Sequence, residues 1–108
     1  MIAFDYDASA ATLRCALKGR MDTQRSDEMG KILNSKLAEI KEGRKDAKEP
    51  LKVVFDLKEV DYVSSGFLRL CLSTAKGLEK GQFSIINTDP FVKKIFKVAE
   101  LEETLNVT

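Results

Sequence analysis

The sequence contains no histidine and only two cysteines among its 108 residues. Without histidine, neither a Ser-His-Asp nor a Cys-His catalytic arrangement is available, and no zinc site can use an imidazole ligand. Two cysteines are also too few for a structural zinc site. These absences exclude several common classes of hydrolase and metal-binding domain.

The chain also lacks an excess of charge of either sign, since 18 basic and 17 acidic residues leave a net charge of +1. We therefore expect neither nucleic acid nor an anionic membrane as its partner. No apolar run is long enough to span a bilayer, and residues 1–10 lack the pattern of a signal peptide. Cys15 and Cys71 form no CxxC motif and lie among apolar residues, which predicts reduced core cysteines in a cytoplasmic protein.

The length and a hydrophobic fraction of 44% predict one domain, residues 1–108, with a real core. Residues 2–6 and 12–19 alternate between apolar and polar, which predicts two strands, and the small polar segment 7–11 between them indicates a hairpin. Residues 21–43 have apolar side chains at helical spacing and end at glycine, which predicts a long helix. The candidates for its N-cap are Asp22, Thr23 and Ser26.

The second half of the chain alternates between strand and helix. Residues 51–57 are dense in Val and Phe without clean alternation, which predicts an interior strand covered on both faces. We then expect a turn at 58–63, a helix from about 65 to 80, a strand at 82–87, a helix at 88–103 capped by Asp89, and, as an optional last element, a strand at 104–107. The order β-β-α-β-α-β-α(-β) predicts an α/β fold with a mixed sheet of four or five strands and helices packed on it.

Two serines and a glycine, Ser64, Ser65 and Gly66, stand where the expected turn meets the second long helix. A serine there can accept a hydrogen bond from an unpaired N–H group of the first helical turn, which stabilises the helix by about 1 kcal/mol. The same position suits a phosphate, because the helix N-terminus is partly positive. The residues alone leave both interpretations open, a cap or a modified serine.

The sequence from residue 53 to residue 105 resembles the STAS domain of anti-sigma factor antagonists. The shared features are a strand ending in Asp-Leu, a Ser-Ser-Gly before a Leu-rich helix, a buried strand, and a helix that begins with proline. The segment GRMD at 19–22 is similar to the Gly-x-Leu-Asp that precedes the first long helix in that family. The resemblance covers nearly the whole chain.

This resemblance implies a bacterial regulator of transcription rather than an enzyme, monomeric when free. Members of the family bind an anti-sigma factor that is also a serine kinase, and phosphorylation of one serine releases them. A metal-dependent serine phosphatase resets the switch. The kinase supplies ATP and Mg²⁺, so the resemblance implies no cofactor for this chain.

The matched positions imply a phosphoacceptor at Ser65, with Ser64 as the alternative. The same matching implies a partner-binding surface made of Asp22, Thr23, Ser64, Gly66, Phe67 and Arg69. Asp56 matches the family's strand-end acid or amide, and Asn87 matches a loop on the same rim. Phe67 replaces a usual glycine, which would put a bulky ring beside the acceptor or mark a local shift that makes Ser64 the acceptor.

Three alternatives differ in class. A STAS-type scaffold or interaction subunit of a signalling complex would bind partners without phosphorylation. A receiver domain would use Asp56, but it needs an acidic pair at an early strand end, where Lys18 and Arg20 stand instead. An enzyme with a serine nucleophile lacks both Gly-x-Ser-x-Gly and a histidine base.

Overall fold

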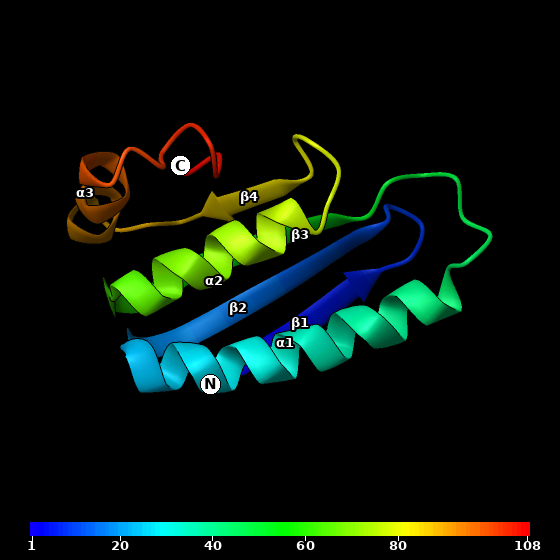
Figure 1. Ribbon diagram of the computed structural model, residues 1–108, viewed down its shortest axis with the longest axis horizontal. Helices are drawn as coiled ribbons and strands as arrows, with labels where there is room; N and C mark the ends of the chain where they lie inside the picture. The colour runs from blue at the N-terminus through cyan, green and yellow to red at the C-terminus, as the bar shows by residue number, and fades with distance from the viewer.

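The computed structural model describes all residues from 1 to 108. It consists of a four-stranded sheet with three helices (Figure 1). The elements are β1 (Ile2–Asp7), β2 (Thr12–Met21), α1 (Thr23–Gly43), β3 (Lys52–Val63), α2 (Ser65–Lys76), β4 (Phe83–Ile86) and α3 (Pro90–Val98). This confirms the predicted order. The optional last strand is reduced to a single parallel bridge between Val107 and Ile85.

The strands lie in the order β1-β2-β3-β4. β1 and β2 form the expected antiparallel hairpin, whereas β2 with β3 and β3 with β4 are parallel, since a helix connects the strands of each pair. Figure 1 shows α1 and α2 side by side in front of the sheet, with α3 beyond the C-terminal end of β4. None of the three helices combines the length and apolarity that crossing a membrane would require.

The core lies between the sheet and the helices. The register pairs Leu13 with Val53 and Cys15 with Phe55, and all four side chains are fully buried. The alternate positions of β2, among them Arg14, are exposed on the other face of the sheet. β3 is therefore an interior strand, but the prediction that both of its faces are covered is wrong. Burial does not alternate strictly along β3, because Asp56 on the open face is also buried, as described below.

β3 is longer than expected. Residues 58–63 were predicted to form a turn, but they continue the strand, with two register shifts against β2. The last pair of the ladder joins Met21 to Val63, and the Ser64 N–H donates to the Met21 carbonyl at 2.9 Å. Because β2 and β3 end together, the helices that follow them both begin at the same edge of the sheet.

The helix boundaries follow the local capping signals. Among the three candidates for α1, Asp22 is the N-cap, and its carboxylate accepts from the Arg25 N–H at 2.8 Å. Asp89 caps α3 in the same way, as expected. α1 ends at Gly43 as predicted, whereas α2 ends at Lys76, earlier than expected.

Candidate functional site

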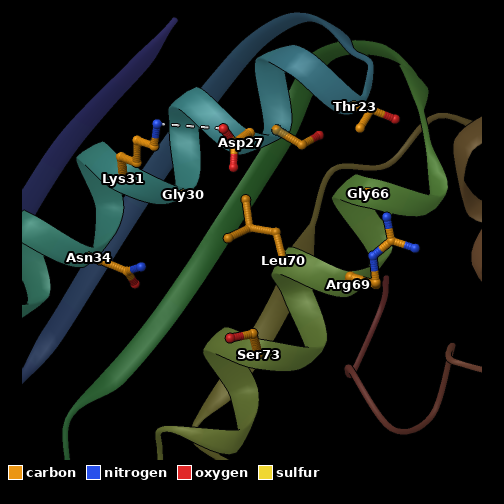
Figure 2. A pocket seen from close by; sticks show the side chains of 10 residues that line it. Thr23, Asp27, Gly30, Lys31, Asn34, Gly66, Arg69, Leu70 and Ser73 are labelled. Atoms are coloured by element: carbon orange, nitrogen blue, oxygen red, sulfur yellow. Dashed lines mark ion pairs between the residues drawn. The ribbon is translucent and has the colours of Figure 1, made fainter.

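The N-termini of α1 and α2 are in contact. A Cβ atom added to Gly66 would lie 3.3 Å from the Thr23 Cα and 3.4 Å from its side chain, so a larger residue at position 66 would push the two helix starts apart. Figure 2 shows Thr23 and Gly66 at the same end of the space between the helices. Two partly positive helix ends therefore share one small region of the surface.

The two serines at this edge have different environments. Ser64 is the N-cap of α2 and only 9% exposed, and its Oγ accepts from the Phe67 N–H at 3.3 Å. Ser65 is the first residue of α2 and is exposed. The cap predicted at this junction is therefore Ser64, and the hydroxyl open to another molecule is that of Ser65.

Phe67 does not belong to this surface. Its side chain is fully buried, and its ring packs on Phe55 with the centroids 6.2 Å apart. Two helical positions turn the chain by about 200° around the helix axis, so Phe67 points to the side opposite Ser65. The prediction that Phe67 contacts a partner or crowds the acceptor serine is wrong.

A polar groove runs from this edge between α1 and α2 (Figure 2). It is lined by Thr23, Ser26, Asp27, Gly30, Lys31, Asn34, Gly66, Arg69, Leu70 and Ser73. Its floor is a close approach of the helices, where a Cβ atom on Gly30 would lie 3.2 Å from Leu70 Cδ1. Asp27 and Lys31 form an ion pair of 3.6 Å along one wall.

Three of the predicted surface residues, Thr23, Gly66 and Arg69, thus line one groove. Asp22 and Ser65 are exposed and adjoin Thr23 and Gly66 in the chain. The polar groove residues farther along α1 and α2 were not predicted from the sequence. Their spacing of three and four residues on both helices, as in 27, 31 and 34, was the signal that could have found them.

Asp56 lies elsewhere, on the open face of the sheet. It is 7% exposed, forms an ion pair with Arg14, and accepts hydrogen bonds from the Lys58 N–H at 3.0 Å and Asn87 Nδ2 at 3.1 Å. Burial raises the pKa of Asp56, but the hydrogen bonds from Arg14, Lys58 and Asn87 outweigh it and hold the pKa below its usual value. Seven residues of β3, 57–63, lie between Asp56 and Ser64. At about 3.3 Å per residue the two positions are roughly 26 Å apart along the strand.

This placement corrects the expected roles of Asp56 and Asn87. Asp56 is in the middle of β3 rather than at a strand end, and it and Asn87 do not share an edge with Ser65. The cluster of Arg14, Asp56 and Asn87 holds β2, β3 and the end of β4 together. No three carboxylate or thiol side chains converge as a metal-binding group would require.

The protein-family model of the STAS domain matches residues 6–108 of this chain. The chain belongs to the STAS domain family. Among the curated proteins, no sequence matches it.

Solved structures of antagonists share the fold. A STAS domain anti-sigma-factor antagonist from Planctomyces limnophilus superposes with a TM-score of 0.77 at 16% identity, over 99% of this chain and 87% of its own. An anti-sigma factor antagonist from Mycobacterium paratuberculosis gives 0.75 at 17% identity, over 99% and 85%. The anti-sigma factor antagonist SpoIIAA in its unphosphorylated form gives 0.63 at 13% identity, over 90% and 82%. At these identities the likeness shows the fold of this STAS domain and not its partner.

Proposed function

We propose that this STAS domain is an anti-sigma factor antagonist, a partner-switching regulator controlled by phosphorylation of a serine at the start of α2. In its unphosphorylated form it binds a cognate anti-sigma factor that is also a serine kinase. Phosphorylation releases the two proteins, and a metal-dependent serine phosphatase restores the binding form. The chain donates a hydroxyl and catalyses nothing itself.

The observation that carries this proposal is the contrast between the two serines. Ser65 offers an exposed hydroxyl, whereas Ser64 is buried and its Oγ already caps the helix. Ser65 is therefore the proposed acceptor, and Ser64 is the alternative. A kinase can reach Ser65 without unwinding α2, and the buried ring of Phe67 leaves that approach open.

A phosphate at Ser65 would change the surface more than the fold. It adds about −1.5 to −2 charges, which the partly positive N-termini of α1 and α2 tolerate. Arg69, one turn farther along α2 and exposed, can pair with it. A partner that covers Asp22, Thr23 and Gly66 would have to bury this new dianion, which opposes binding.

Mass spectrometry of the protein purified from its native cells tests the proposal. Intact-mass and peptide spectra are compared for the native protein, Ser65→Ala and Ser64→Ala. One phosphate that disappears only in Ser65→Ala supports the proposed acceptor. A phosphate that disappears only in Ser64→Ala moves the switch to the cap residue, where the modified oxygen faces the first N–H groups of α2.

The absence of phosphate in every growth condition contradicts the switch. The STAS-type scaffold would then be the better description, with Ser64 a cap and Ser65 a solvated residue. Acetyl phosphate with Mg²⁺ adds a control, because a receiver domain would be labelled on Asp56 and this chain should not be.

A further inference from the structure

α3 leaves apolar side chains in solvent on the side that does not face the core. Phe91 and Val98 are 60% and 74% exposed, whereas Val92 and Phe96 are fully buried. Positions 91, 95, 98 and 99 follow helical spacing, so they form a second apolar stripe on this short helix. Apolar surface gathered in this way is typical of an interaction site.

The stripe forms one wall of a groove between α3 and α2. Leu68, Phe91, Ile95, Val98 and Ala99 line the groove together with Lys94. Leu68 is three residues after Ser65 on α2, so the two side chains are neighbours on the helix surface. The groove therefore begins one helical turn from the proposed phosphoacceptor.

The charges beside this groove are basic. Lys94 lines it, and Lys97 lines an adjoining hollow that shares Lys94 and Val98 with it. The one acidic residue in the two linings, Glu102, lies 4.0 Å from Lys93. Lys94 and Lys97 have no ion-pair partner in the structure. An occupant that carries carboxylates would complement them.

We propose that the groove of Leu68, Phe91, Ile95 and Val98 binds an acidic amphipathic helix of the partner protein. Apolar side chains of that helix, about one per turn, fill the groove, and its Asp or Glu residues pair with Lys94 and Lys97. The inference rests on the proposed function for the identity of the partner, which is the protein that covers Ser65. It adds the chemistry by which that partner is recognised.

The test is a titration of the full chain, labelled with ¹⁵N and unphosphorylated, with two synthetic helical peptides. Both carry leucines at i, i+4 and i+7, and one has glutamates beside them where the other has lysines. The glutamate peptide should shift the amide signals of α3 and of the first turn of α2. It should bind at least about tenfold more tightly than the lysine peptide.

Variants of the chain sharpen the result. Replacing both exposed apolar residues, Phe91→Ser with Val98→Ser, should weaken the glutamate peptide at least about tenfold. The double change Lys94→Glu with Lys97→Glu should reverse the preference between the peptides. Ile32→Ser is the matched control, because Ile32 is another exposed apolar residue, 45% exposed, on α1. It should leave both affinities unchanged.

Three outcomes would overturn the proposal. The first is equal binding of the two peptides, or no shift in α3. The second is binding of the chain to phosphatidylserine vesicles that Phe91→Ser abolishes, which assigns the groove to a membrane surface. The third is concentration-dependent dimerisation that Phe91→Ser abolishes, which assigns it to a second copy of the chain. The peptide titration uses only the unphosphorylated chain. A negative titration would therefore not contradict phosphorylation of Ser65, and the absence of phosphate on Ser65 would not contradict peptide binding in the groove.

Discussion

Thr23 and Gly66 touch at the point where the two long helices begin. A Cβ atom added to Gly66 would lie 3.3 Å from the Thr23 Cα, which leaves no room for a branched side chain. The contact arises because β2 and β3 end in register at Met21 and Val63. Each strand leads within two residues into a helix on the same face of the sheet. The proposed phosphoacceptor, Ser65, therefore sits beside a second helix N-terminus rather than at an isolated one.

Gly66→Val should separate these helix starts. The branched side chain would meet Thr23 backbone, which cannot rotate away, and overpacking of this kind destabilises a protein by about 1–3 kcal/mol. Urea denaturation monitored by circular dichroism measures the loss. Gly43→Ala is the control, since nothing lies within 4 Å of the added Cβ at position 43. A Gly66→Val protein as stable as this control would contradict the contact.

Ser64→Ala and Ser65→Ala should differ in stability. Loss of the N-cap in Ser64→Ala removes the acceptor for the Phe67 N–H and should lower the free energy of unfolding by about 1 kcal/mol. Ser65→Ala should change it by less than about 0.5 kcal/mol, because that side chain is exposed. The same urea series measures both. The reverse order would show that Ser65 is the cap.

Phe67→Ala should be severely destabilising, by about 3–5 kcal/mol, because it removes a fully buried ring that packs on Phe55. Phe91→Ala is the matched control on α3, where the ring is 60% exposed. That change should stay within about 0.5–1 kcal/mol. Similar losses for the two variants would mean that Phe67 is nearer the surface than the structure has it.

Arg14→Gln should destabilise the protein in a pH-dependent way. The folded-state pKa of Asp56 is lowered from 3.8, so its ionised form stabilises the fold above that pH, and this stabilisation is lost as the pH falls through the folded-state pKa. At pH 7 the variant should be less stable than the wild type, because a nearly buried carboxylate loses its charged partner. Below pH 3.8 the difference between variant and wild type should shrink as Asp56 is protonated. Urea denaturation at neutral and acidic pH checks the sign, and a difference that grows with acid would refute it.

Both cysteines should be unreactive in the folded protein. Cys15 and Cys71 are fully buried and unpaired, and burial raises the pKa of the Cys15 thiol to about 12 and that of Cys71 well above its usual value. Since the thiolate is the reactive form, a disulfide reagent such as dithionitrobenzoate should label neither residue at pH 8 until urea unfolds the chain. Rapid labelling of one thiol without urea would reveal a local opening.

Local signals were sufficient for the order of the elements and for most helix starts. Asp22 and Asp89 are short acidic side chains ahead of apolar helical stripes, and a cap needs only the N–H groups of the next turn. The paired serines and glycine marked the start of α2 for the same reason. The alternation of Leu13, Cys15 and Leu17 was enough to place β2 with one face in the core.

What the sequence by itself determined is thus the α/β order, the STAS resemblance and the position of the serines between a strand and a helix, because each depends on spacing along the chain. Only the tertiary structure decided that 58–63 extends β3, since this segment, charged at 58, 59 and 61, becomes strand by pairing with β2. It also decided that Phe67 faces the core and Ser65 the solvent, and that Asp56 is buried beside Arg14. Which side of a helix or strand is covered depends on the elements packed against it, and that information is not local to any segment.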